Sequence, residues 1–312
     1  MRVVFFGSPE FAVPTLQKVA AAHEVALVVC QPDRPAGRGR AVAAPAVKTA
    51  AVALGLPVEQ PLKLKDPELA ARLASLKPDL FVVIAYGRIL PPALLAVPRL
   101  GPYNVHASLL PHYRGAAPIQ WAIIRGEKVS GVAIMQMEEG LDTGPVVAVR
   151  EESIRDDDTA GSLAGRLSQL GADLMIETMP NIEAGTITVT PQDHARATLA
   201  PILTKEDGLL DFHKPAHLVS AHARGVDPWP GATAVIDAEV VKLFTPTVVT
   251  LDGHAGKVGE ILGAGPKGLQ IACAQGIVAF AELQFPGRKR LPAAAVLAGR
   301  AIPAGTVAAG KV

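Results

Sequence analysis

The segment from Asp79 to Ala85, DLFVVIA, constrains the fold more than any other part of the chain. It is an almost continuous apolar run that contains β-branched and aromatic residues. A strand that faces water on one side alternates apolar with polar residues, whereas a strand buried on both faces reads as a continuous apolar run. The segment therefore predicts a central strand of a parallel sheet that is covered on both sides.

Strand-like and helix-like patterns alternate through the first half of the chain. Short apolar runs predict further strands at 2–7, 24–30, 104–108 and 131–136, and helical patterns occupy 10–22, 45–54, 66–76 and 119–125. This alternation predicts an α/β fold with a Rossmann-like, mostly parallel sheet and flanking helices. In open sheets of this kind, ligands bind outside the carboxyl ends of the strands.

The pattern changes near residue 190. A long helix is predicted from Thr159 to Ala184, and a stretch without clear periodicity follows it. Further on, short apolar runs separated by Gly, Asp and Pro are typical of a small β-barrel. We therefore predict a first domain over 1–190, a linker over 191–207 and a small OB-like β-barrel domain over 208–312.

Composition excludes several classes of protein. The chain has 312 residues, of which 49% are hydrophobic and 19% charged, as expected for globular domains with a buried core. The net charge of +1 excludes a surface coated in positive charge, although it permits a local basic patch. Two cysteines, Cys30 and Cys273, provide neither a disulfide framework nor a CxxC zinc site. We expect no bound metal.

The sequence contains no pattern typical of membrane insertion or secretion. No apolar run approaches the roughly 20 residues of a membrane helix. The apolar run at the start, from Met1 to Gly7, is too short for a signal peptide. We expect a cytoplasmic protein without a membrane partner.

The stretch 104–118, NVHASLLPHYRGAAP, is the most informative candidate site. Asn104, His106 and Ser108 alternate with apolar residues, and alternate side chains of a strand share one face. Three polar residues on one face, at the end of an α/β strand, indicate a functional site. A hydrogen-bonded strand end that faces solvent explains the same pattern equally well.

A second candidate residue, Asp142, lies between Gly140 and Gly144 in a loop after an apolar strand. A carboxylate beside a histidine raises the pKa of the imidazole and orients the ring, which suits acid–base chemistry near neutral pH. Taken alone, an ordinary turn aspartate is the commoner explanation. The sequence by itself does not bring Asp142 to His106.

Two basic segments have alternative interpretations. Arg34, Arg38 and Arg40 lie in a loop rich in Gly and Pro, and arginine can contact phosphates or stack on an unpaired base. From composition alone, a mobile surface loop is the simpler interpretation. The final stretch, 283–312, contains five basic residues and no acidic residue. It predicts either a solvated tail or solubilising surface, or a contact with a phosphate backbone. The basic residues are Arg288, Lys289, Arg290, Arg300 and Lys311.

Two motifs together resemble the formyltransferases that use 10-formyltetrahydrofolate. They are NVHASLLPHYRG at 104–115 and GLDTG at 140–144. Three further parts are similar to the members of that family that act on initiator methionyl-tRNA. These parts are FGSPEFA at 6–12, QPDRPAGRG at 31–39, and the pair LTKED at 203–207 and DPWPG at 227–231. The resemblance spans nearly the whole chain.

The resemblance implies a reaction in which the α-amino group of methionyl-tRNA attacks the formyl carbonyl of the folate cosubstrate. It implies that Asn104 and His106 donate hydrogen bonds to the oxyanion and that His106 and Asp142 relay protons. No nucleophilic serine or cysteine is needed, since the amine is itself the nucleophile.

The resemblance also implies where the two substrates bind. The residues expected to contact the folate are Ser108, Leu109, Leu110 and Pro111. The residues expected to contact initiator methionyl-tRNA are Arg34, Arg38, Arg40 and Lys205, and the OB-like barrel is expected to hold the tRNA body. We expect the chain to act as a monomer.

Three other functions remain open at this point. A formyltransferase acting on a sugar amine, or a hydrolase releasing formate from the same folate, would keep the three catalytic residues. An inactive module that binds tRNA or folate would need none of them. The arginine loop favours tRNA, and the intact Asn104, His106 and Asp142 favour an enzyme.

Overall fold

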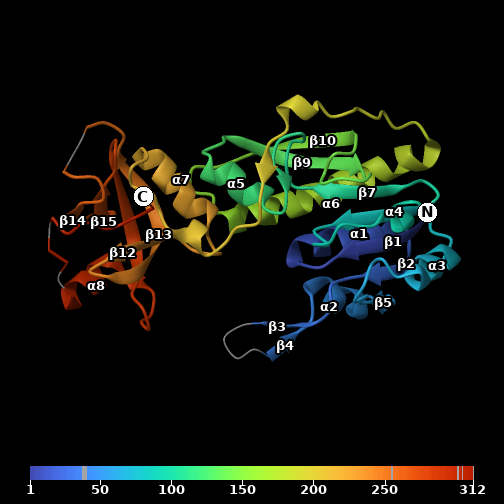
Figure 1. The fold of residues 1–312 in the computed structure, drawn as a ribbon, viewed down its shortest axis with the longest axis horizontal. Coiled ribbons are helices and arrows are strands. Elements are labelled where there is room, and N and C mark those ends of the chain that lie inside the picture. The colour runs from blue at the N-terminus through green and yellow to red at the C-terminus, as the bar shows by residue number, and fades with distance from the viewer. Residues whose placement is uncertain (37–40, 254–255, 301, 304, 312) are drawn as a thin grey trace. The chain divides into compact units, whose positions relative to one another are not determined.

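The computed structural model describes residues 1–36, 41–253, 256–300, 302–303 and 305–311. The chain forms two compact units, which Figure 1 shows as ribbons. The first comprises Met1–Pro118, Val129–Ser153 and Ala164–Pro201, and the second comprises Ile119–Lys128, Ile154–Leu163 and Ile202–Val312. The second unit therefore includes two short segments that come before residue 164. The predicted domain limits and the linker over 191–207 stay predictions.

A seven-stranded sheet organises the first unit. Its strand order is β10-β9-β7-β6-β1-β2-β5, and β9 alone among these seven strands runs opposite to the others. The prediction of a mostly parallel, Rossmann-like sheet is thus confirmed. The strands are β1 (Arg2–Gly7), β2 (Glu24–Val29), β5 (Val58–Glu59), β6 (Leu80–Ile84), β7 (Pro102–His106), β9 (Val129–Gln136) and β10 (Val146–Ser153).

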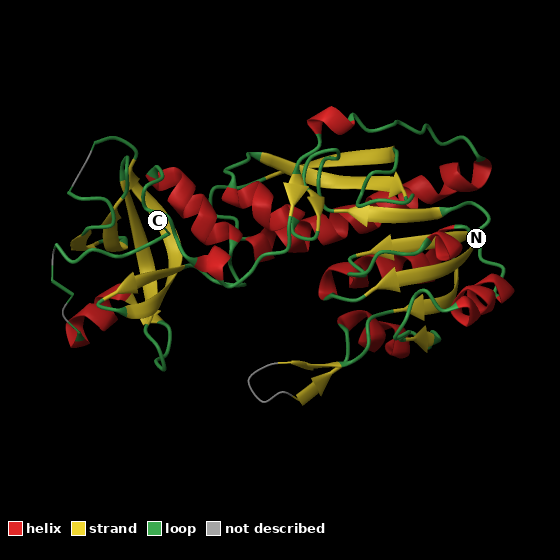
Figure 2. Ribbon diagram, viewed as in Figure 1, coloured by secondary structure: helices red, strands yellow, loops and turns green. Residues whose placement is uncertain are grey.

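Helices flank this sheet, as Figure 2 shows. They are the 3₁₀ turn η1 (Glu10–Ala12), α1 (Val13–Ala22), α2 (Ala46–Ala53), α3 (Pro67–Ser75), α4 (Pro92–Leu95) and α6 (Ala160–Ala184). Smaller elements complete the unit: β3 (Arg34–Ala36) with β4 (Ala41–Ala43), β8 (Arg114–Gly115) with β11 (Leu199–Ala200), and the 3₁₀ turn η2 (His194–Arg196).

The central strand β6 is buried along its whole length, as the continuous apolar run predicts. Phe81 of this strand packs on Phe6 of β1 with ring centroids 5.0 Å apart, in a cluster that also contains Leu69 and Leu73 of α3. Phe5, whose side chain follows the opposite face of β1, is fully buried as well. Both faces of the sheet are therefore covered.

Helix α6 lies close against β7 because residue 171 is glycine. A Cβ atom at Gly171 would lie 2.8 Å from Cγ1 of Val105, which is closer than side-chain carbons normally approach. Val105 immediately precedes His106 on β7. The helix thus supports the strand that carries the first candidate residue.

The second unit is built around an antiparallel sheet. Its strand order is β12-β13-β16-β15-β14, with β17 beside β16. The strands are β12 (Thr233–Ile236), β13 (Glu239–Thr250), β14 (Ile261–Gly265), β15 (Gly268–Ala272), β16 (Ile277–Gln284) and β17 (Leu291–Pro292). The unit also holds α5 (Pro118–Ile124), the 3₁₀ turn η3 (Glu206–Gly208), α7 (Ala216–Gly225) and α8 (Ala293–Gly299).

The last residues of the chain join the two edges of this sheet. The amide of Ile261, where β14 begins, donates to Thr306 O at 2.7 Å. On the other edge, the amide of Val235 in β12 donates to Ala309 O at 2.9 Å. One segment thus bridges both edges of a curled, half-barrel sheet, which confirms the small OB-like domain expected from the spacing of the apolar runs.

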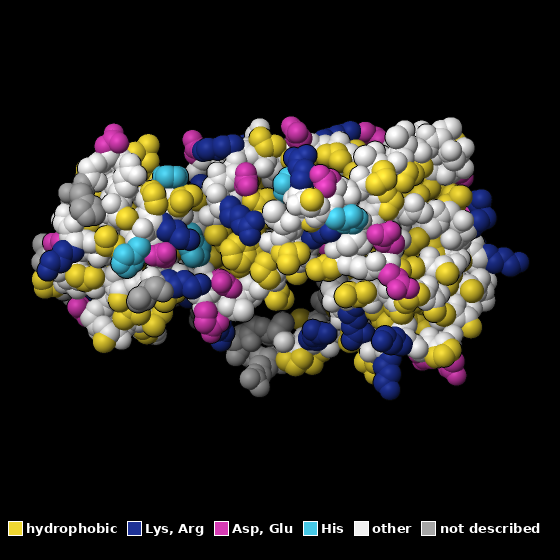
Figure 3. Space-filling view, turned by 45° about the horizontal axis from the view of Figure 1, so that its top comes forward, with side chains coloured by type: hydrophobic (Ala, Val, Ile, Leu, Met, Phe, Trp, Pro, Cys, Tyr) yellow, Lys and Arg dark blue, Asp and Glu magenta, His cyan; other side chains and the backbone are white. Residues whose placement is uncertain are grey.

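These contacts show that the interpretation of 283–312 as a solvated tail is wrong. The stretch contains β17, α8 and the segment that bridges the two edges of the curled sheet. Two of its arginines are also used locally: Arg290 pairs with Glu282 and lies 4.1 Å from the Phe244 ring, while Arg300 pairs with Glu239. In Figure 3, basic and acidic side chains are interspersed, in keeping with the net charge of +1.

Among the described helices, none combines the length and the apolar character that crossing a membrane would require.

The packing of β6 leads to a stability prediction. Phe81→Ala should lower the free energy of unfolding of the first unit by about 3–5 kcal/mol, because it leaves a cavity in a fully buried cluster. Urea-induced unfolding followed by circular dichroism measures the loss. Val52→Ala is the matched control, since Val52 is 63% exposed on α2 and the change should stay within about 0.5 kcal/mol. Equal effects of the two changes would contradict this account of the core.

Candidate active site

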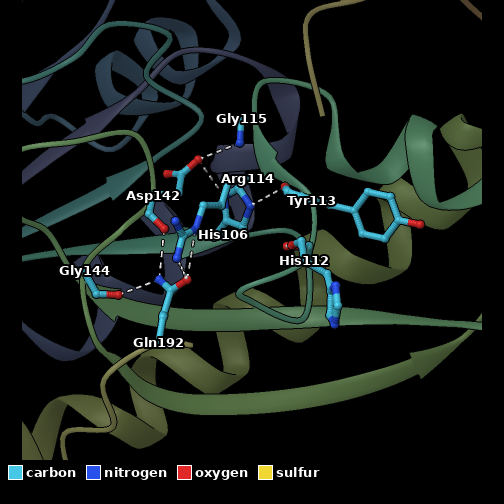
Figure 4. Close-up of polar contacts among 9 residues, drawn as sticks. His106, His112, Tyr113, Arg114, Gly115, Asp142, Gly144 and Gln192 are labelled. Carbon is cyan, nitrogen blue, oxygen red and sulfur yellow. Dashed lines mark hydrogen bonds and ion pairs between the residues drawn. The ribbon is translucent and has the colours of Figure 1, made fainter. Parts of the chain in front are cut away.

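His106 is the last residue of β7, and its side chain is buried at the carboxyl end of that strand. Its Nε2 lies 3.0 Å from the backbone oxygen of Tyr113 (Figure 4). Because a carbonyl oxygen only accepts hydrogen bonds, Nε2 carries the proton and donates it. The other ring nitrogen, Nδ1, is thus the one that faces Asp142.

Asp142 reaches His106 from the loop between β9 and β10. This loop leaves the sheet beside Tyr103, since Gln136 at the end of β9 pairs with that residue. The carboxylate Oδ2 lies 3.7 Å from His106 Nδ1 and accepts a hydrogen bond from the amide of Gly115 at 2.8 Å. The structure therefore brings together the two residues that the sequence alone could not connect.

Gly115 can hold the carboxylate because it has no side chain. Its φ is +121°, and a Cβ atom there would lie 2.7 Å from Ala200 O, across the short β8–β11 pairing. Only glycine can combine this backbone conformation with so close an approach. The strand pair thus places one backbone N–H opposite Asp142.

Asn104 lies two residues before His106 on β7 and is half-buried. Side chains two residues apart on a strand share one face, so the Asn104 amide lies on the same face as the imidazole. The prediction that Ser108 extends this face is wrong, because β7 ends at His106. Ser108 is buried, and its hydroxyl donates to His112 O at 2.6 Å within the following turn.

The segment expected to contact the folate belongs to the same turn. The peptide bond between Leu110 and Pro111 is cis, and Leu109 packs against Gly131 of β9. Ser108 and Leu109 thus have contacts within the first unit. A role of Ser108, Leu109, Leu110 and Pro111 in binding the folate stays a prediction.

A groove of about 660 Å³, which the sequence analysis missed, borders the Asp142 loop. Its walls are largely aliphatic and include Leu62 and Ile89, which are 77% and 71% exposed. Large exposed aliphatic side chains around a hollow indicate a surface that a ligand covers. The lining residues are Leu62, Leu64, Lys65, Arg88, Ile89, Leu90, Pro91, Pro92, Glu139 and Gly140.

The arginine-rich stretch forms a short hairpin where a loop is expected, with β3 paired to β4. Arg34 is exposed and donates to Gln31 Oε1 at 3.0 Å. At the root of the hairpin, hydrogen bonds from Lys48 and Gln60 hold the pKa of the Asp33 carboxyl below its usual value. Arg38 and Arg40 lie outside the described residues.

Lys205 is in the second unit, directly before the turn η3, and is exposed. The turn is held by Asp207, whose carboxylate accepts from the amide and the hydroxyl of Thr204. The imidazole of His222 in α7 donates to Asp207 O at 2.7 Å. These bonds hold the backbone on either side of Lys205 while its ammonium group stays accessible.

The site combines a buried imidazole, a carboxylate and a side-chain amide, which suits proton transfer and the stabilisation of a developing negative charge. Within the part of the chain that the structure describes, no cluster of three or more His, Cys, Asp or Glu side chains is arranged to hold a metal ion.

Comparison with known families identifies the class of protein. The formyl transferase family model matches residues 1–179, and the model of the formyl transferase C-terminal domain matches residues 202–301. The first match covers more than half of the chain. The chain therefore belongs to the formyl transferase family.

Full-length relatives narrow this assignment. A methionyl-tRNA formyltransferase of Citrifermentans bemidjiense is 48% identical over 300 residues, which cover 96% of this chain and 93% of the relative. One from Sorangium cellulosum is 47% identical over 308 residues, covering 98% and 99%. Within its family, the chain belongs with the methionyl-tRNA formyltransferases.

Solved structures share the fold. HypX from Aquifex aeolicus, crystallised with tetrahydrofolic acid, matches 95% of this chain with a TM-score of 0.63 and 22% identity, and the match spans 47% of that longer protein. The sugar 3N-formyl transferase WlaRD, crystallised with dTDP and 5-N-formyl-THF, matches 93% of this chain and 99% of its own with a TM-score of 0.69 and 16% identity. At these identities the likeness concerns the fold alone.

The two cysteines lead to a chemical prediction. Both are buried, and burial raises the pKa of the Cys30 thiol to about 11 and that of Cys273 to about 12. Both thiols are protonated at pH 8, and the thiol is far less nucleophilic than the thiolate. The folded protein should therefore not react with DTNB at pH 8, whereas two thiols should react in guanidinium chloride. Rapid reaction of either thiol in the folded protein would contradict the assigned burial.

Proposed function

We propose that the chain transfers the formyl group of 10-formyltetrahydrofolate to the α-amino group of methionyl initiator tRNA, the step that prepares this tRNA for translation initiation. The observation that carries the proposal is the juxtaposition of His106 and Asp142, 3.7 Å apart at the end of β7. Asn104, on the same strand as His106, is the third residue to which the proposal gives a catalytic role. Near full-length identity of 48% to a methionyl-tRNA formyltransferase supports the choice of substrate.

The groove beside the Asp142 loop fits the folate cosubstrate. Its volume of about 660 Å³ suits a molecule of drug size, and its aliphatic walls suit the ring systems of a folate. Lys65 and Arg88 at its border suit the carboxylates of a folate tail. The groove includes Glu139 and Gly140, so a ligand in it lies two residues along the chain from Asp142.

His106 and Asn104 act on the formyl oxygen in this proposal. The amine nitrogen bonds to the formyl carbon, the bond from that carbon to the folate N10 breaks, and negative charge develops on the oxygen in between. Both ring nitrogens of His106 face protein groups, Nε2 the backbone oxygen of Tyr113 and Nδ1 the Asp142 carboxylate, so a protonated imidazole acts on the oxyanion through its positive charge. The Asn104 amide donates the hydrogen bond to that oxygen in this proposal. Burial strengthens both interactions, because water no longer screens them.

Asp142 takes part in moving the proton from the attacking amine to the leaving nitrogen. The attacking amine loses a proton and the leaving N10 gains one, so the site needs a group that accepts and returns it. Nε2 of His106 is held by Tyr113 O, which leaves Nδ1 and the Asp142 carboxylate as the pair that exchanges protons. The Gly115 amide holds that carboxylate in place.

Contacts with the tRNA come from both units in this proposal. The exposed Arg34 and Lys205 are suited to phosphates, and we assign the same role to Arg38 and Arg40 on the basis of the sequence. We propose that the enzyme acts as a monomer in the cytoplasm, where charged initiator tRNA is used. Light scattering of the purified chain, with and without tRNA, tests the monomer.

A sugar amine is the second candidate acceptor. It is favoured by one observation, the fold shared with WlaRD at a TM-score of 0.69. The identity in that match is only 16%, against 48% for the methionyl-tRNA formyltransferase. The tRNA therefore remains the better supported acceptor.

The deciding experiment offers the enzyme 10-formyltetrahydrofolate with one acceptor at a time: initiator methionyl-tRNA, elongator methionyl-tRNA and a dTDP-linked amino sugar. Formylation of the initiator tRNA alone is expected. Formyl transfer to the sugar, or release of formate without any acceptor, would overturn the proposed substrate while keeping the catalytic residues.

His106→Ala should lower kcat by about 10²- to 10⁴-fold, the usual loss when a positioned acid–base group is removed. Single-turnover formylation of initiator methionyl-tRNA measures this loss. His23→Ala is the control, because His23 directly precedes the amino end of β2. A kcat within a few-fold of wild type for His106→Ala would refute its catalytic role.

Arg34→Ala should raise KM for tRNA several-fold with little change in kcat, since one phosphate contact contributes to binding at a distance from the reacting groups. The increase should shrink as salt is added. Arg99→Ala is the matched control, because Arg99 is exposed but already pairs with Asp79. An unchanged KM for Arg34→Ala would contradict the proposed contact between Arg34 and the tRNA.

A further inference from the structure

A buried glutamine, Gln192, connects the Asp142 loop to the strand that holds the Asp142 carboxylate. Its Nε2 donates to Asp142 O at 2.9 Å and to Gly144 O at 2.6 Å. Gln192 comes fifty residues after Asp142 in the chain and is 8% exposed. Figure 4 shows its amide group between the backbone of the loop and the side chain of Arg114.

The oxygen of the Gln192 amide also takes part in two hydrogen bonds. Gln192 Oε1 accepts from Nε of Arg114 at 3.1 Å and from a terminal nitrogen of the same guanidinium at 2.6 Å. A primary amide has two N–H groups and two lone pairs on its oxygen, and here all four are engaged. Rotating the amide by half a turn would set N–H against guanidinium and oxygen against two carbonyls, so its orientation is defined.

Arg114 is itself fixed. It is 7% exposed, and its terminal nitrogen lies 3.1 Å from Nδ1 of His194. The next residue, Gly115, donates its backbone amide to the Asp142 carboxylate. The segments 114–115 and 142–144 are therefore joined twice, once through the carboxylate and once through Gln192.

The double connection matters because Asp142 has an unfavourable backbone conformation. Its φ is +52°, in the left-handed region that residues other than glycine seldom adopt. Such a conformation is strained and persists only where neighbouring contacts enforce it. The Gln192 amide binds the carbonyl of Asp142 itself and that of Gly144, so it acts directly on this conformation.

From this geometry we propose that Gln192 is a positioning residue that holds Asp142 against His106, with Arg114 orienting its amide. The role rests on the proposed formyl transfer, since it acts on that reaction through Asp142. It requires the two N–H donors of Gln192. A side chain of the same shape without donors should leave the fold largely intact and misplace the carboxylate.

Gln192→Glu is the sharpest test. The variant keeps the shape and an acceptor for Arg114, but it sets a carboxylate oxygen against the carbonyls of Asp142 and Gly144. We expect kcat to fall about 10- to 100-fold while KM for the folate and for tRNA stays within about threefold, because positioning residues act on the transition state. The amide of Gln192→Asn is one methylene too short to reach both partners. The kcat of this variant should therefore lie between those of the wild type and of Gln192→Glu.

Two further measurements separate positioning from a purely structural role. Amide hydrogen exchange of 137–145 should be faster in Gln192→Glu than in wild type, and the pH profile of kcat should shift. Gln284→Glu is the matched control, because Gln284 also donates to a backbone carbonyl, that of Arg288. This control should keep the wild-type kcat and the wild-type exchange of 137–145.

The outcomes distinguish the two proposals. A wild-type enzyme that transfers no formyl group refutes the proposed function, whereas exchange of 137–145 still tests whether Gln192 holds the loop. An active wild type with a Gln192→Glu variant of unchanged kcat and unchanged exchange overturns the positioning role. If Gln192→Glu fails to fold, an unchanged kcat in the folded Gln192→Asn variant also overturns it.

Discussion

Burial of the parallel sheet on both faces is the constraint on which the first unit depends. Strands such as β6 carry no polar face, so helices must cover each side and polar chemistry cannot lie within the sheet. Polar groups gather instead where the chain leaves the sheet. This arrangement explains the position of His106 as the last residue of β7. Its backbone is supported by the core, while its imidazole reaches the loops.

The site is assembled from backbone groups as much as from side chains. The imidazole is oriented by Tyr113 O and the carboxylate by the Gly115 amide. Gly115 belongs to the β8–β11 pairing, so the position of its amide is determined before any substrate arrives. Gln192 extends this arrangement to the loop on the other side of the imidazole.

The cations of the chain divide into two groups. Arg114, Arg290 and Arg300 bind partly or fully buried side chains of their own unit and help to define its structure. Lys205 is exposed, and Arg34 is exposed while it donates to Gln31, so both present positive charge to solvent although the net charge of the chain is only +1. The proposed contact with tRNA therefore requires only a few suitably placed cations on a nearly neutral protein, and not a surface that is basic throughout.

By itself the sequence determined the fold class and the motifs. The apolar run at 79–85 indicated two-sided burial, and the order of residues from Asn104 to Gly115 indicated the family, because both properties are local in the chain. The curled sheet followed from short apolar runs, but the bridging of its two edges by 306–309 did not. That segment carries no strand pattern of its own, and its partners lie far away in the chain.

The tertiary structure alone decided which residues meet. His106 and Asp142 are 36 residues apart, and Gln192 lies 50 residues beyond Asp142, so no local pattern connects them. The groove walls come from separate segments around residues 62, 89 and 139, and their hollow exists only after packing. Residue type and spacing indicate which side chains of a segment are buried. Contacts between distant segments depend on how strands order themselves in the sheet and where loops return across it.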